Sequence, residues 1–234
     1  MGKRFKGGTC AYCGKGGETA DHVFARGLFP ADKREGIPQV ASCEPCNRAK
    51  SVIEHYLLTV LPFGNRHAAS SSMLSDLVPG RLAKNVRLHR QLAEGRMVVR
   101  LVENGVEHST GAVPFDGARL FAYLGFVARG LAAFHFGRIV PTHYIVNAGM
   151  VTPEQDNILC TLFVGRSRDY ACGNLGEGAL LYEGQQAVDD PDLTLWRFLL
   201  YNGMVFHDDN AKVPIAPDLW AVVSRTSMPG LADV

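Results

Sequence analysis

The sequence predicts an α+β protein in which a small cysteine-rich module, residues 1–64, precedes a larger α+β domain, residues 65–234. Three observations support this class. Four of the six cysteines stand in two close pairs within the first 50 residues. Two β-rich segments flank Asn104-Gly105, a dipeptide that favours a hairpin turn. An apolar periodicity over residues 116–137 predicts a core helix.

The composition fits a folded chain with two chemically different parts. With 234 residues, 47% of them hydrophobic and 20% charged, the chain can bury a sizeable core, which excludes general disorder. The net charge of +1 gives no hint of a nucleic-acid or membrane partner. The first 50 residues, however, hold nine Lys/Arg and five Asp/Glu, against fifteen and eighteen in the rest. The acidic balance of the second part argues against a second large DNA-binding surface there.

The apolar segments indicate a cytoplasmic protein without a membrane partner. The N-terminus lacks the apolar stretch of a signal peptide. The longest apolar segment, residues 120–137, is interrupted by Arg129 and His135 and falls short of a membrane span. In a reducing compartment, clustered cysteines favour a metal site over disulfides.

In the first part, the expected elements are a short strand beginning in residues 21–29 and a helix from near Cys46 to about Leu61. Apolar residues recur on one face of this helix. In the second part, residues 66–94 look helical with a break at Pro79-Gly80. The remaining expected elements are a β-hairpin over 97–102 and 106–113, the core helix over 116–137, a helix over 153–163, and short strands near Leu180, 196–206 and 219–223.

The cysteine spacing predicts one structural zinc site. The two Cys-x-x-Cys pairs are separated by 29 residues and consist of Cys10 with Cys13 and Cys43 with Cys46. A two-residue gap lets both thiolates of a pair bind the same ion, and two pairs complete a tetrahedral shell with no open position for a reacting water. Cys160 and Cys172 lack paired spacing and are expected to be core cysteines.

Candidate catalytic groups lie next to these cysteines. Asp21 and His22 stand between the two pairs, and Asn47 directly follows the last cysteine. Carboxylate and amide oxygens suit Mg²⁺ or Mn²⁺. An adjacent histidine can take a proton from water near neutral pH. The set predicts a one-metal phosphodiesterase.

The combined pattern over residues 8–60 resembles the zinc-containing HNH endonucleases of the ββα-metal fold. It consists of the cysteine pairs, Asp21-His22-Val23, and Asn47-Arg48-x-Lys50. The resemblance implies that His22 is the general base and that Asp21 and Asn47 hold the catalytic Mg²⁺ or Mn²⁺. It also implies that Arg48 and Lys50 contact nucleic acid, with DNA the expected substrate and RNA still open.

One departure from the family pattern keeps an alternative open. The family usually has an Asn in the loop before the second cysteine pair, where it orients the catalytic histidine. No Asn occurs here between Asp21 and Asn47, and Gln39 is the nearest amide. The alternative is a non-catalytic zinc ribbon that binds nucleic acid or a protein. Glu54 is expected to pair with Lys50 across one helical turn in preference to holding a metal-bound water.

Overall fold

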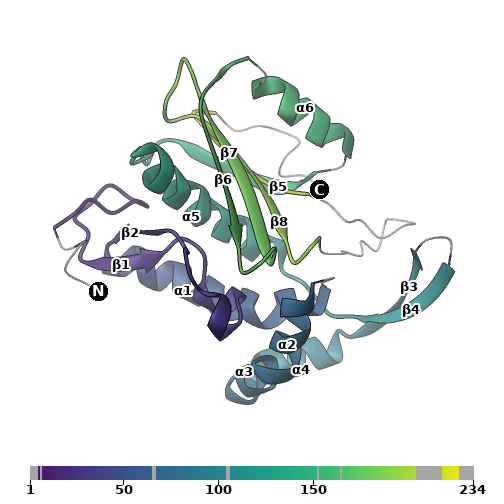
Figure 1. Cartoon of the computed structure of the whole chain (residues 1–234). Coiled ribbons are helices and arrows are strands. Elements are labelled where there is room, and N and C mark those ends of the chain that lie inside the picture. Colours follow the sequence, from purple (N-terminus) through teal and green to yellow (C-terminus); the bar gives the residue numbers. More distant parts are fainter. Residues whose placement is uncertain are drawn as a thin grey trace.

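The computed structural model describes residue 5 and residues 7–64, 67–103, 106–151, 153–163, 165–203 and 218–226. The expected α+β class is confirmed (Figure 1). The turn at Asn104-Gly105 and the end of the strand expected over 196–206 lie outside the described residues.

The N-terminal part is a two-stranded antiparallel hairpin followed by a long helix. Strand β1 (Thr19–His22) pairs with β2 (Gln39–Ser42), and α1 (Glu44–Val60) follows after one residue. Cys43 is the N-cap of α1. The helix therefore starts directly from the β2 edge, with its first turn beside β1. The helix expected from Cys46 to about Leu61 is confirmed within two residues.

Three short helices follow, with breaks that differ from the expected one. They are α2 (Ala68–Asp76), α3 (Val78–Lys84) and α4 (Val86–Glu94). The chain breaks at Leu77 and Asn85, whereas Pro79-Gly80 lies inside α3. Pro79 occupies the first turn of α3, where a helix has no internal partner for the missing N–H. The expectation of a break at Pro79 was wrong for this reason.

The second part is a five-stranded antiparallel sheet with a helix on each face. A separate hairpin, β3 (Met97–Glu103) and β4 (Val106–Ala112), precedes α5 (Gly117–Phe136). The sheet has the order β5-β9-β8-β7-β6. Its strands are β5 (Ile145–Val151), β6 (Ser167–Leu175), β7 (Leu180–Ala187), β8 (Thr194–Leu200) and β9 (Asp218–Ser224), and α6 (Pro153–Phe163) follows β5.

Helix α5 is the centre of the molecule, between the N-terminal part and the sheet (Figure 1). It begins at the cap residue Asp116 and ends at Gly137, which adopts a left-handed conformation with φ of 63°. Its expected core face is buried at Leu120, Leu124, Val127 and Leu131. Phe134 is the exception, because 48% of this residue is exposed.

One hydrophobic core joins the two parts of the chain. Val23, which follows β1, packs with Val127 and Leu131 of α5 in the same cluster that continues into the sheet. At Gly130 a side chain would meet Val23 within 2.9 Å, so α5 and the hairpin approach closely there. The boundary predicted at residue 64 is thus not a gap in the packing. A smaller cluster lies between α6 and the opposite sheet face.

Two further expectations concern the second part. Cys160 and Cys172 are both exposed, so their assignment to the core was wrong. Cys172 lies on the edge strand β6, where Ala171 and Leu175 are the inward-facing residues. Among the described residues, no helix combines the length and apolar character needed to cross a membrane.

Candidate metal and catalytic site

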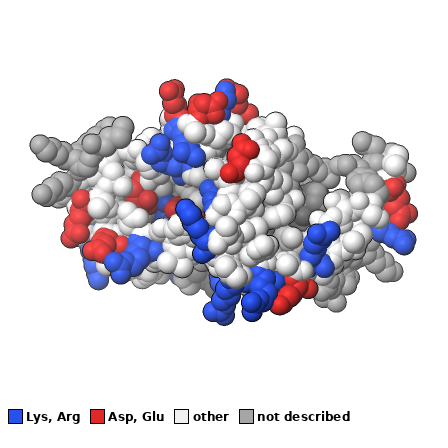
Figure 2. All heavy atoms as spheres, turned by 90° about the horizontal axis from the view of Figure 1, so that it is seen from below, with Lys and Arg blue, Asp and Glu red and all other residues white. Residues whose placement is uncertain are grey.

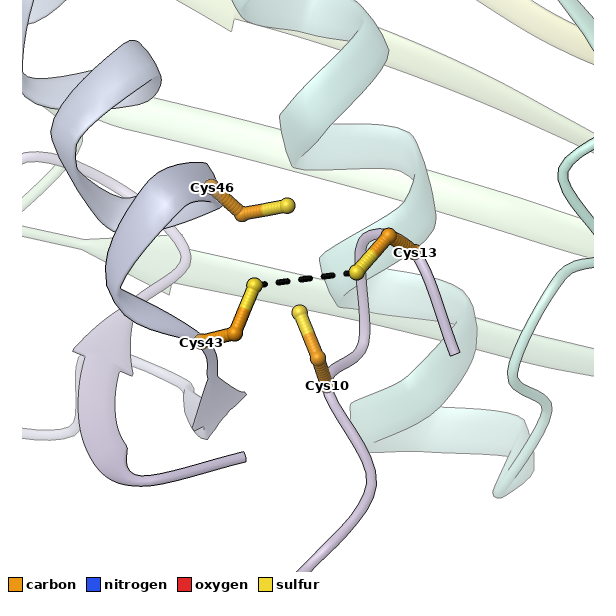
Figure 3. Close-up of side chains that lie close together, drawn as sticks. All are labelled: Cys10, Cys13, Cys43 and Cys46. Atoms are coloured by element: carbon orange, nitrogen blue, oxygen red, sulfur yellow. Dashed lines mark hydrogen bonds between the residues drawn. The ribbon is translucent and has the colours of Figure 1, made fainter. Parts of the chain in front are cut away.

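The four paired cysteines form one cluster at the start of α1 (Figure 3). Their sulfur atoms lie within 4.8 Å of one another, and Cys13 Sγ is 3.6 Å from Cys43 Sγ. A tetrahedral ion with metal–sulfur bonds of about 2.3 Å would hold its sulfurs about 3.8 Å apart. All four are free thiols. The cluster can therefore bind one metal ion, as the spacing predicts.

Local backbone geometry builds this cluster. Gly14 has a φ of 74°, and its N–H donates to the Cys10 carbonyl over 2.9 Å, which closes the first Cys-x-x-Cys turn. The second pair is held by the first turn of α1, because the Asn47 N–H donates to the Cys43 carbonyl over 3.0 Å. Burial alone would raise the pKa of the Cys10 thiol, but backbone N–H groups of Cys43, Tyr12 and Cys13 lower it to about 7.

Asp21 and His22 end strand β1, and Asp21 lies in a closed polar network. The Tyr12 hydroxyl donates to Asp21 Oδ2 over 2.5 Å, and Lys50 Nζ lies 3.0 Å from the same oxygen. Lys50 Nζ also donates to the His22 carbonyl over 2.6 Å and to Glu54 Oε1 over 2.7 Å. One ammonium group thus ties the end of β1 to helix α1. The expected pairing of Lys50 with Glu54 is confirmed.

The position of Lys50 contradicts its expected contact with nucleic acid. Only 1% of its side chain is exposed, and its three acceptors enclose the ammonium group. A buried lysine needs such partners. Moving a charged ammonium group out of water without a partner costs on the order of several kcal/mol. Lys50 is an internal cation, and the prediction that it contacts phosphate was wrong.

His22 is held by the amide of Gln39, its partner in the β1–β2 register. The two Nε2 atoms are 2.7 Å apart. Burial lowers the pKa of the His22 imidazole, the charge of Arg26 lowers it further, and Asp21 opposes both. The ring is therefore mainly neutral at neutral pH, which is the form that can accept a proton. The amide proposed as a substitute for the missing Asn does contact the histidine.

Asn47 and Arg48 occupy the first turn of α1. Asn47 is half-buried, and its Nδ2 donates to Thr19 Oγ1 over 3.3 Å. Arg48 is exposed and pairs with Glu44 over 2.9 Å. Arg48 therefore remains accessible to a phosphate group. Asn47 contacts Thr19 and Lys50 contacts Asp21. Asn47 and Lys50 lie on one face of α1, and Thr19 and Asp21 lie on one face of β1, so these two faces pack against each other.

Two tyrosines complete the site, and sequence reasoning missed both. Tyr12 lies inside the first Cys-x-x-Cys turn, and its ring meets Phe126 of α5 edge to face, with centroids 5.3 Å apart. Tyr123 Oη accepts from the Ala25 N–H over 2.8 Å, and its ring centroid lies 5.9 Å from Lys50 Nζ. Burial raises the pKa of both phenols well above 10. They therefore act as neutral hydroxyls.

Among the described residues, the four cysteines are the one group of three or more His, Cys, Asp or Glu side chains placed to share an ion. Comparison with known proteins adds no further identification. No family model, no curated protein and no solved structure matches this chain.

Proposed function

We propose that the chain is a metal-dependent HNH endonuclease that hydrolyses phosphodiester bonds in DNA. The observation that supports this most is the setting of His22. It is a neutral imidazole at the end of a β-strand, held by the Gln39 amide and adjacent to the Asp21 carboxylate. The order of a hairpin, a following helix and a cysteine cluster at their junction supports the proposal of a ββα-metal module.

The cysteine cluster is assigned to a structural Zn²⁺. Four thiolates are soft ligands that favour zinc over Mg²⁺ or Mn²⁺. A complete shell leaves no coordination position for a substrate or water. In small modules of this kind, zinc supplies roughly 10–16 kcal/mol of apparent folding free energy. Its role here is to fix Cys43 and the start of α1 against the first cysteine turn, which places Asn47 beside β1.

The reaction is assigned to the groups at the end of β1. His22 takes a proton from a water molecule, whose oxygen attacks phosphorus while the bond to the 3′ oxygen breaks, and the leaving 3′ oxygen takes a proton from solvent. The products are a 5′-phosphate and a 3′-hydroxyl. A divalent ion bound through Asp21 and Asn47 would supply charge stabilisation at the phosphoryl group and at the leaving oxygen. The Tyr12 and Lys50 contacts of Asp21 both use Oδ2, so Oδ1 is the oxygen that would bind the ion.

The Gln39 contact also fixes which nitrogen of His22 can act as the base. A neutral imidazole donates from one nitrogen and accepts at the other. If the Gln39 carbonyl oxygen accepts from Nε2–H, then Nδ1 carries the lone pair and can take the proton. If the amide NH₂ faces Nε2, the proton resides on Nδ1 and the ring has no free acceptor. In the structure the amide nitrogen of Gln39 faces His22 Nε2, so catalysis requires the Gln39 amide to turn over and present its oxygen to Nε2.

A second candidate function has specific support. The Asp21 carboxylate is already neutralised by Lys50, and the Asn47 amide donates to Thr19. The Lys50 charge competes with a divalent ion at Asp21, and the Thr19 contact holds the Asn47 side chain against β1 through its Nδ2. A zinc module with this arrangement would bind nucleic acid or a protein without cleaving it. The two candidates differ in one outcome, namely cleavage.

The test compares three zinc-loaded proteins on plasmid DNA in Mg²⁺ and in Mn²⁺. The wild type is expected to nick or cut the DNA, and His22→Ala is expected to abolish cleavage with the fold intact. His55→Ala is the matched control, because His55 is exposed on α1 and should retain wild-type activity. A parallel RNA substrate tests the preference for DNA. Equal cleavage by wild type and His22→Ala would assign the activity elsewhere.

A further inference from the structure

Positive charge is concentrated in one short segment of the second part of the chain. Between residues 81 and 100 there are six Lys/Arg and one acidic residue, Glu94. The segment covers the second half of α3, all of α4 and the start of β3. The overall acidic balance of residues 51–234 hides this segment, because the compensating acids lie elsewhere in the chain.

Four of these cations are exposed and unpaired, which sets them apart from most other surface cations. In the part of the chain that the structure describes, no acidic group pairs with these four, namely Lys84, Arg87, Arg90 and Arg96. By contrast, Arg48, Arg138 and Arg225 have carboxylate partners at 2.9, 2.9 and 3.0 Å. Uncompensated charge of one sign is the electrostatic feature that attracts a polyanion.

Helix α4 presents this charge on a regular face. Its apolar side is buried at Leu88 and Leu92, so the opposite side is exposed to solvent. Arg87 and Arg90 lie one helical turn apart and line a surface hollow of about 410 Å³ together with Val86, Gln91 and Glu94. Gln91 adds a neutral hydrogen-bond donor. Figure 2 views the side of the molecule on which α3 and α4 lie, where Lys and Arg side chains are spread over the surface with Asp and Glu side chains between them.

The basic segment is anchored to the candidate site. The guanidinium of Arg81 donates to the Leu58 carbonyl near the end of α1, and Gly27, soon after His22, lies against both residues. Asn47 and Leu58 are 11 residues apart on α1, about 16 Å along the helix axis. That distance corresponds to about five base pairs of duplex DNA. The point at which the basic segment is anchored to α1 therefore lies about five base pairs of duplex from Asn47.

We propose that the α3–α4 surface, formed by Lys84, Arg87, Arg90 and Arg96, binds the phosphate backbone of a nucleic-acid duplex. The inference rests on the proposed function, since it assigns the anchoring surface for the same substrate. Contacts of this kind hold the polymer in place but read no sequence. The hollow offers one apolar side chain, Val86, which is too little for the apolar face of a membrane-surface helix.

The test measures binding without cleavage, in the His22→Ala background, by fluorescence anisotropy on a short labelled DNA duplex. Arg87→Gln with Arg90→Gln removes two phosphate contacts, which should lower the salt slope by about 1.8. Between 50 and 200 mM salt, the affinity of this variant should therefore fall about 12-fold less than that of the parent. Arg166→Gln with Arg168→Gln removes the same charge from exposed positions near β6 and should leave the slope unchanged.

Three outcomes would overturn the inference: an unchanged slope in the α4 variant, an equal change in the control, or tighter binding to poly-glutamate or anionic vesicles than to DNA. A duplex RNA competitor distinguishes the two sources of backbone phosphate. Binding with the predicted slopes in a protein that never cleaves DNA would refute the nuclease alone. If the wild type cleaves DNA but the Arg87→Gln/Arg90→Gln variant binds DNA as its parent does, this surface alone is refuted.

Discussion

Replacing Lys50 with methionine tests the internal ion pairs that hold the end of β1 against α1. Methionine keeps most of the side-chain length and removes the charge. The change leaves two carboxylates without their cation, because Lys50 Nζ lies 3.0 Å from Asp21 Oδ2 and 2.7 Å from Glu54 Oε1. Those two side chains are 13% and 17% exposed, so water reaches them only in part.

The expected loss of stability follows from this burial. Removing one partner of a buried ion pair costs about 3–5 kcal/mol, since the remaining charge is left uncompensated. Asp21 keeps the Tyr12 hydroxyl at 2.5 Å, which offsets part of the loss. We therefore expect Lys50→Met to lower the free energy of unfolding by about 3–5 kcal/mol at pH 8.

The loss of stability in Lys50→Met should be smaller at lower pH. The direction of this pH dependence follows from the pKa of Glu54. Burial raises the pKa of the Glu54 carboxyl, and Lys50 opposes that shift. A group with a raised pKa in the folded state stabilises the fold at low pH, and this contribution disappears as pH rises through that pKa. Without Lys50 the folded pKa of Glu54 rises further. The difference between variant and wild type should thus shrink to about 1–3 kcal/mol near pH 6.

Denaturant unfolding of the zinc-loaded proteins at both pH values measures these differences. Lys84→Met is the matched control, because Lys84 is exposed and should change stability by no more than about 0.5 kcal/mol. Adding Glu54→Gln to Lys50→Met should recover part of the loss at pH 8. If Lys50→Met and Lys84→Met unfold alike at pH 8, the buried network does not hold β1 to α1.

Further predictions concern the zinc site, the base and the sheet. Cys13→Ser should lower bound zinc, measured by metal analysis, from one per chain towards none and unfold the N-terminal part, whereas Cys172→Ser should keep it. Because burial lowers the pKa of His22, the acidic limb of the cleavage pH–rate profile should have its midpoint below 6.5, and a higher midpoint would contradict the assigned base. Gly184→Ala would bring a Cβ within 2.1 Å of a tryptophan ring and should cost about 1–3 kcal/mol in thermal unfolding, whereas Gly80→Ala meets open space inside α3 and should stabilise by about 0.5–1 kcal/mol.

Local patterns made part of the fold predictable. The helices α1, α5 and α6 follow from apolar periodicity and end signals, and the cysteine cluster follows from two spacings of fixed length. Strands β5 and β6 were not predicted, because apolar and polar residues do not alternate regularly along either strand. β5 carries a buried Asn147, and the edge strand β6 buries just Ala171 and Leu175 among residues that are mostly polar.

The site shows the same division between local and distant determinants. The Lys50–Glu54 pair depends on spacing along one helix and was predictable. The contact of Lys50 with Asp21 depends on how β1 docks on α1, and the Tyr123–Ala25 bond joins residues 98 positions apart. No local pattern encodes such contacts. The burial of Lys50, which overturned its assignment to nucleic acid, belongs to this second kind.

The most direct test of the proposed activity is cleavage of supercoiled plasmid DNA by zinc-loaded wild type and Asp21→Asn in Mn²⁺, followed by analysis of the DNA ends. The account predicts nicked and linear DNA with 5′-phosphate and 3′-hydroxyl ends from the wild type. Asp21→Asn should leave the plasmid intact while retaining its zinc and its fold. Plasmid that stays supercoiled with the wild type in both Mn²⁺ and Mg²⁺ would contradict the account and favour the non-catalytic zinc module.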